Sequence, residues 1–115
     1  MAKKTPRYIY CFIRTDLGEA QRIVQASHAC YEMGRTVEHD HDGDPPHMVL
    51  LGVRDEQELE QVSRHVRGAG VEYHMFYEPD YDTGFTALAT VPLRGEARQM
   101  MRDYSLYRPA EAHAE

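Results

Sequence analysis

The chain has 115 residues, the size of one domain, and its charge excludes several classes of partner. Its 13 lysines and arginines are outnumbered by 19 aspartates and glutamates, a formal net charge of −6, so no overall basic field attracts nucleic acid or an anionic membrane. No stretch approaches the ~20 apolar residues of a membrane span, and the first ten residues lack the apolar core of a signal peptide. We therefore expect one cytoplasmic domain over residues 8–108, with an N-terminal tail (1–7) and a C-terminal tail (109–115).

The first strand and helix are predicted between Tyr8 and Gly34. The run Tyr8–Ile13 is rich in β-forming residues without polar alternation, which is typical of a strand covered on both faces. Asp16 and Glu19 then have the spacing of a capping box, and Gly34 is a suitable C-cap. Small and apolar residues at three-and-four spacing predict the helix face that packs on the sheet: Ala20, Ile23, Val24, Ser27, Cys30 and Tyr31.

A polar stripe runs along the same helix and contains Gln21, Gln25, His28 and Glu32. Because the helix begins at the carboxyl end of the strand, where open α/β sheets usually bind ligands, the stripe predicts a binding crevice that starts near Arg14 and Thr15. The alternative is an ordinary solvated helix face, in which His28 is only a hydrogen-bonded histidine. The sequence leaves both interpretations open.

The histidines, aspartates and cysteines of this chain are not spaced as in any known metal-binding motif. Histidines and aspartates within residues 39–47 match neither a zinc finger nor the twelve-residue calcium loop, so an acidic loop is the simpler explanation, although metal binding by this loop stays open. We expect no metal and no other cofactor. Cys11 and Cys30 occupy apolar positions without a CxxC or His-Cys spacing, which indicates buried thiols of a reducing compartment.

The rest of the chain predicts an α/β sheet. Three further strands are expected at Met48–Val53, Val71–Tyr77 and Phe85–Val91, with a helix after the first of them and another after Gly95. The link between the last two strands is too short for a parallel return, which needs a dozen or more residues, so they should form an antiparallel hairpin. The C-terminal helix, with Met100, Met101 and Tyr104, should cover one face of the sheet or a homodimer contact.

Four stretches of sequence resemble the peptidyl-tRNA hydrolase type 2 family. They are Arg14-x-Asp16-Leu17, Gln25-x-Ser27-His28-Ala29, Met48-Val49-Leu50 with the acidic helix after it, and Thr86-Ala87-Leu88-Ala89-x-x-Pro92. The match spans roughly residues 8–92 and looks closest to the short branch called peptidyl-tRNA hydrolase domain-containing proteins, whose third strand also runs into a turn that contains glutamate. The resemblance implies a three-layer α/β/α fold with a four-stranded mixed sheet whose last strand is antiparallel.

The same resemblance implies hydrolysis of the ester between a peptide and the ribose of tRNA, without a metal. In such chemistry a carboxylate orients or deprotonates water, and amide, hydroxyl or cationic donors stabilise the oxyanion. Carried over residue by residue, the catalytic set is Gln25, Asp80, Thr86 and His28. The implied substrate-binding set is Arg7, Arg14, Asp16, Gln21, Arg22 and Ser27.

The chain departs from the family at three places. Gln21 stands where the family has an active-site lysine, four residues before the glutamine. The family's Asp-Ala-Gly-Arg-Thr turn is absent, and only Arg7 lies near the position of a second family lysine. A binding or regulatory module on the same fold, without catalysis, is therefore the alternative to a hydrolase.

Overall fold

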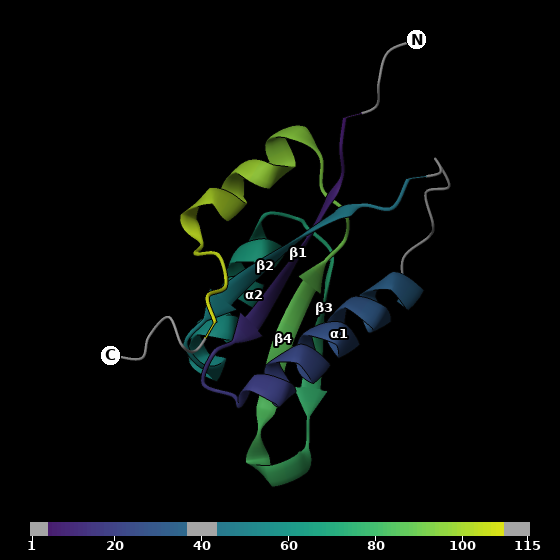
Figure 1. The fold of residues 1–115 in the computed structure, drawn as a ribbon. Coiled ribbons are helices and arrows are strands. Elements are labelled where there is room, and N and C mark those ends of the chain that lie inside the picture. Colours follow the sequence, from purple (N-terminus) through teal and green to yellow (C-terminus); the bar gives the residue numbers. More distant parts are fainter. Residues whose placement is uncertain (1–4, 37–43, 110–115) are drawn as a thin grey trace.

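A computed structural model describes residues 5–36 and 44–109. Along the chain the elements are β1 (Tyr8–Arg14), α1 (Glu19–Thr36), β2 (His47–Val53), α2 (Glu56–Gly68), β3 (Tyr73–Glu78), the 3₁₀ segment η1 (Asp80–Asp82), β4 (Gly84–Thr90) and the 3₁₀ segment η2 (Gly95–Asp103) (Figure 1). Most of the acidic loop considered as a metal site, and most of both tails, lie outside the described residues. None of the described helices is long and apolar enough to span a membrane.

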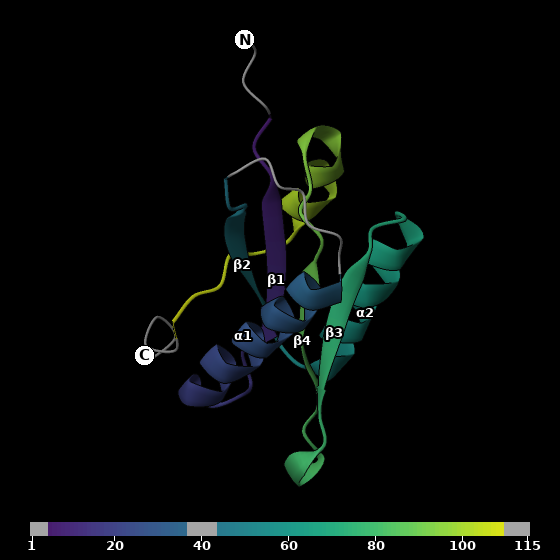
Figure 2. The ribbon, with the colours of Figure 1, turned by 90° about the vertical axis from the view of Figure 1, so that its right-hand side faces the viewer.

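The sheet has the strand order β2-β1-β4-β3. β1 pairs in parallel with β2, while β4 runs antiparallel to both β1 and β3. In Figure 1, α1 lies in front of the sheet and α2 behind it, and Figure 2 shows the same arrangement after a quarter turn. The expected three-layer α/β/α fold with a four-stranded mixed sheet and an antiparallel last strand is thus confirmed.

The two faces of the sheet bury different kinds of side chain. Because side chains alternate along a strand, Tyr10 and Phe12 of β1 point toward α2, while Ile13 points toward α1. The α2 side contains large apolar groups such as Leu59 and Leu88, and the α1 side contains mainly small ones: Ala29, Ala87 and Ala89 with Ile13 and Met33. Small residues on the strands let α1 lie close to the sheet.

The face of α1 that packs on the sheet is not the predicted one, so that prediction was wrong. Ile23 and Tyr31 are 66% and 65% exposed, whereas Gln25, Ala29 and Met33 are buried. The helix is rotated toward its polar flank because the amide of Gln25 finds hydrogen-bond partners on the sheet, so its burial costs little. Periodicity alone gives no sign of those partners.

The two long helices begin differently. At α2, Asp55 is the N-cap and its carboxylate accepts a hydrogen bond from the Glu58 backbone N–H at 2.9 Å, the contact that defines a helix N-cap. α1 begins at Glu19 instead, and the Asp16 carboxylate pairs with Arg14. A strong local cation therefore takes the side chain that the spacing assigns to the helix cap.

The C-terminal segment packs on its own chain. η2 is a 3₁₀ helix whose Met101 is buried in the core on the α2 side, and the ring of Tyr104 meets that of Phe12 edge-on at 4.9 Å. After it, the Tyr107 N–H donates to the Leu50 carbonyl at 2.9 Å, so this segment covers part of the outer edge of β2. The residues expected at a homodimer contact are thus largely used within the chain.

Candidate functional site

A buried amide links three elements at the carboxyl ends of β1 and β3. Gln25 of α1 is only 2% exposed, and its Oε1 accepts a hydrogen bond from Thr86 Oγ1 of β4 at 2.7 Å. Its Nε2 donates to Glu78 Oε1 of β3 at 3.1 Å and to Gln21 Oε1 one helical turn earlier at 3.0 Å. We call Thr86, Gln25 and Glu78 the polar chain; its amide is fixed in one orientation because both of its ends are hydrogen-bonded.

The polar chain ends at the carboxylate of Glu78, which reaches solvent. Its Oε2 accepts from the Asp80 backbone N–H at 3.2 Å. The hydrogen bond from Gln25 lowers the pKa of Glu78, with further contributions from the Asp80 N–H and from the nearby His28. Donors that favour the ionised form keep this carboxylate charged at neutral pH.

Glu78, and not Asp80, is the carboxylate that contacts Gln25. The side chain of Asp80, the catalytic carboxylate implied by the family resemblance, belongs to an exposed residue of η1. Sequence reasoning missed Glu78 because its role depends on the strand register. The available signal was its place at the end of β3, where it forms a carboxylate pair with Asp80.

The remaining residues of the helix signature lie beside the polar chain or away from it. The exposed His28 ring stacks on Phe76 of β3, with centroids 4.6 Å apart and planes 28° apart. This contact keeps the imidazole near Glu78, where it lowers the pKa of that carboxyl. Ser27 is also exposed, but it is two residues after Gln25 and so about 200° around the helix from it.

Arg14 is engaged inside the molecule. Its Nε and Nη2 both donate to the Asp16 carboxylate at 2.9 Å, and its Nη1 donates to the carbonyls of Thr83 and Phe85 at 2.6 and 3.0 Å. The guanidinium therefore ties the end of β1 to the turn before β4. Because four of its hydrogen bonds are internal and the residue is 9% exposed, Arg14 holds the site in place instead of presenting a cation to phosphates.

The other two expected cations do not reach the polar chain either. Arg22 donates to the carbonyls of Leu17 and Thr15 at 2.7 and 2.8 Å and to the Tyr107 hydroxyl at 3.1 Å. Arg7 precedes β1 and donates to the Asp44 carbonyl. The seven residues of β1, about 20 Å, separate Arg7 from the carboxyl end of the strand.

The turn that carries Asp80 has an unusual backbone. Tyr81 and Asp82 have φ of 57° and 54°, the left-handed region that non-glycine residues rarely occupy, and the Tyr81 side chain is fully exposed. Glu56 of α2 fastens the end of this turn, because its Oε2 accepts from the Phe85 N–H at 2.8 Å. Together with the hydrogen bonds from Arg14 to Thr83 and Phe85, this contact fixes the position of the β3–β4 turn next to Glu78.

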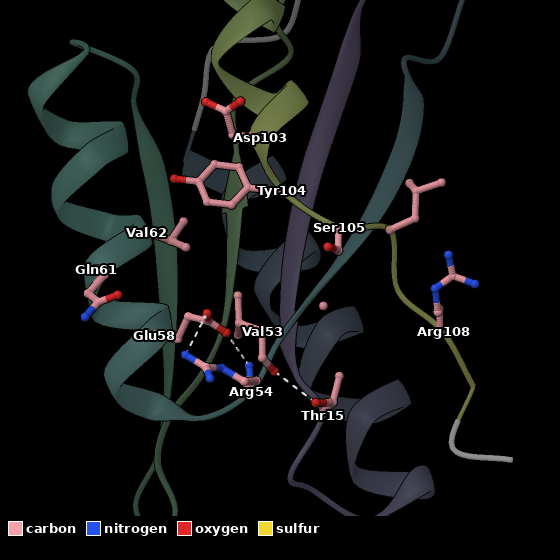
Figure 3. Close-up of a pocket in the computed structure, with 12 residues that line it drawn as sticks. Thr15, Val53, Arg54, Glu58, Gln61, Val62, Asp103, Tyr104, Ser105 and Arg108 are labelled. Atoms are coloured by element: carbon pink, nitrogen blue, oxygen red, sulfur yellow. Dashed lines mark hydrogen bonds and ion pairs between the residues drawn. The ribbon is translucent and has the colours of Figure 1, made fainter. Parts of the chain in front are cut away.

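A hollow of about 520 Å³ lies on the α2 side of the sheet, between α2 and the C-terminal segment (Figure 3). Val62 and Tyr104 form part of its wall, and Arg54 pairs with Glu58 at its lower end, where Arg54 Nη2 lies 3.4 Å from Glu58 Oε2. None of the residues of the polar chain lines it. The chemistry-bearing groups thus lie on the other face of the sheet from this hollow.

Among residues 5–36 and 44–109, no three histidine, cysteine, aspartate or glutamate side chains are grouped so that they could hold a metal ion. The groups near the polar chain are mainly acidic, since Asp16, Glu78, Asp80 and Asp82 all lie at the same end of the sheet.

Comparison with known proteins gives a similarity of fold. No protein-family model matches the chain, and no curated protein matches it. Among solved structures, a protein of unknown function from Agrobacterium tumefaciens strain C58 superposes with a TM-score of 0.62 at 10% sequence identity. The match covers 91% of this chain and 100% of that one. At this level of identity the similarity extends to the fold alone.

Proposed function

We propose that this chain is a peptidyl-tRNA hydrolase-like enzyme, which cleaves the ester between a peptide, or an acylated amino acid, and tRNA. The observation that carries the proposal is the polar chain, in which a buried hydroxyl and amide hold the Glu78 carboxylate at the end of β3. A buried, fully hydrogen-bonded amide stabilises a domain less than an apolar residue of its size would, so a role in function explains it better than packing does. The helix signature and the antiparallel last strand support the same family.

In the proposed reaction, Glu78 orients a water molecule and accepts its proton as the water oxygen attacks the ester carbonyl. The bond between the carbonyl carbon and the ribose oxygen then breaks, and the ribose oxygen takes up the proton. His28, exposed beside Phe76, is the candidate donor to the oxyanion or to the leaving oxygen. Gln25 positions Glu78 and does not donate to the oxyanion, because its N–H groups already bind Glu78 and Gln21.

The charges around Glu78 set the expected rate. A lowered pKa keeps this carboxylate ionised at neutral pH but makes it a weaker base, so proton transfer from the water to Glu78 should be slow. The lysine that the family has at the position of Gln21 is absent. We therefore expect slow turnover, in a cytoplasmic setting where peptidyl-tRNA is made.

A second function is a binding or regulatory module on the same fold. The observation that favours it is the internal use of Arg14 and Arg22, which removes two of the expected phosphate contacts. An enzyme that neutralises three tRNA phosphates should show log affinity falling against log salt with a slope of about −2.7. A module that recognises another partner should not bind tRNA with this salt-dependent affinity.

The test is release of N-acetyl-amino acid from N-acetyl-aminoacyl-tRNA at low salt. We expect turnover by the wild-type chain, loss of at least tenfold in Glu78→Gln, and a change below about threefold in the matched control Asp80→Asn. Loss in Asp80→Asn with retention in Glu78→Gln would return the catalytic role to Asp80. Absence of turnover from folded wild-type protein would refute the hydrolase and leave the binding module.

A further inference from the structure

The two cysteines of the chain meet between β1 and α1. Cys11 is a β1 residue only 1% exposed, and Cys30 is a partly buried residue of α1, 19 positions later. The Cys11 Sγ lies 3.8 Å from the Ala26 carbonyl oxygen, which belongs to the helical turn just before Cys30. Cys30 packs against the same cluster on the α1 side as Ala26, so the two cysteines lie on neighbouring elements, and both thiols are free. The fold thus juxtaposes two thiols that carry no motif in the sequence.

The two thiols are chemically unequal. Cys11 is almost completely buried and its S–H donates to the Ala26 carbonyl, while Cys30 is only partly buried. The interaction with Cys30, together with burial, raises the pKa of Cys11, and the interaction with Cys11 lowers the pKa of Cys30. The sulfur that ionises first is therefore the one closer to solvent, and its neighbour is a buried thiol within reach. This is the arrangement of an attacking thiol with a resolving thiol.

We propose that Cys11 and Cys30 form an oxidant-sensitive modification site, which hydrogen peroxide converts to an intramolecular disulfide. The Cys30 thiolate attacks one peroxide oxygen, the O–O bond breaks, and the released hydroxide takes up a proton to become water. The Cys11 sulfur then attacks the Cys30 sulfenic acid, the S–O bond breaks, and a second water leaves with the Cys11 proton. The two thiols lose two electrons, and the peroxide is reduced to two waters.

The disulfide would join α1 to the central strand one turn after Gln25. Because it closes a loop of about 20 residues, it should restrict the unfolded chain and raise the Tm by roughly 5 °C or more. The bond would form between a strand and a helix already packed together, so little rearrangement is required. A thiol reductant should reverse both the bond and the rise in Tm.

The experiment treats the reduced full chain with one equivalent of hydrogen peroxide and maps its tryptic peptides without reduction. Cleavage after Arg7, Arg14, Arg22 and Arg35 places Cys11 in peptide 8–14 and Cys30 in peptide 23–35. We expect these peptides to be joined, with a protein mass lower by two hydrogens. Separate oxidised peptides, or disulfides only between two chains, would overturn the proposal.

Two variants assign the order of events. In Cys11→Ala the Cys30 sulfenic acid has no resolving thiol, so it should accumulate and be trapped by dimedone. In Cys30→Ala the buried Cys11 should remain reduced under the same treatment. Rapid oxidation of Cys11 in this second variant would refute the order. If either variant fails to fold, the peptide map of the wild-type chain still decides whether the disulfide forms.

Discussion

The two faces of the sheet are built for different purposes. The α2 face buries large apolar side chains such as Phe12, Leu59 and Leu88, and the α1 face buries a glutamine and a threonine among alanines. Apolar burial contributes roughly 25 cal/mol per Å², whereas a buried polar pair contributes little more than it costs. The comparison teaches that stability resides mainly on the α2 face and the candidate chemistry on the α1 face.

The largest expected effect tests this division. Leu59→Ala removes a fully buried side chain from the α2 face and should lower the free energy of unfolding by about 3 kcal/mol. The matched control is Ile23→Ala on α1, where an apolar side chain that is 66% exposed should change it by less than about 0.5 kcal/mol. Urea denaturation followed by circular dichroism gives both values. Equal losses would show that α1 packs on the sheet through its apolar stripe after all.

The next effect concerns the turn that supports the site. Gly84 has φ of +83°, and a Cβ there would lie 2.3 Å from Glu56 Oε2. Gly84→Ala should therefore cost about 2 kcal/mol and displace Glu56 from the Phe85 N–H. Gly68→Ala, where a Cβ meets nothing within 4 Å, is the control and should be neutral or slightly stabilising. Thermal unfolding of both variants is sufficient, and a Tm for Gly84→Ala equal to that of the control would contradict the tight turn.

A somewhat smaller effect is expected within the polar chain. Thr86→Val keeps the shape but removes the donor to Gln25 Oε1, which leaves a buried acceptor without its partner at a cost of about 1–2 kcal/mol. Thr86→Ser retains the hydroxyl and should lose less. Denaturant midpoints compare the two variants. If valine is tolerated better than serine, the hydroxyl is not what holds Gln25.

Among the test substitutions, Gln21→Lys should change stability least, and it should raise activity. Gln21→Lys puts an ammonium group near Glu78, because the Gln21 side chain already lies 3.0 Å from the Gln25 amide that binds this carboxylate. Position 21 is exposed, so the free energy of unfolding should change by less than about 1 kcal/mol. Hydrolysis of N-acetyl-aminoacyl-tRNA should rise several-fold. Gln21→Met is the uncharged control, and an equal rise in both variants would exclude the missing cation as the cause.

Sequence reasoning predicted the fold better than the site. The order of strands and helices followed from apolar runs and from the short link before β4, which are local signals. The rotation of α1 was mispredicted because it depends on the partners of Gln25, which come from β3 and β4. For the same reason sequence reasoning did not indicate that Glu78, and not Asp80, is the carboxylate bonded to Gln25. Arg14 and Arg22 are engaged partly by near neighbours such as Asp16 and Leu17 and partly by residues distant in the chain, and the spacing of the arginines indicates neither set of contacts.

The pH dependence of turnover follows from the same contacts. Since the pKa of Glu78 is lowered in the folded chain, the carboxylate stays ionised through neutral pH, and turnover should fall only when the pH drops below the ordinary glutamate range. The ionised Glu78 stabilises the fold at pH values above the pKa that this residue has in the unfolded chain. That stabilisation is lost as the pH falls through the lower pKa of Glu78 in the folded chain. A rate profile whose acid limb lies near neutrality would assign the essential base to another group.

The most direct test of the account is the pKa of Glu78, measured by NMR titration of its side-chain carboxyl carbon in the wild-type chain and in Gln25→Met. The account predicts a value below that of an ordinary glutamate in the wild-type chain, because Gln25 donates to the charged form. The value should rise toward the ordinary one in the variant. An ordinary pKa in the wild-type chain, or the same lowered pKa in both proteins, would contradict the polar chain as the element that holds this carboxylate.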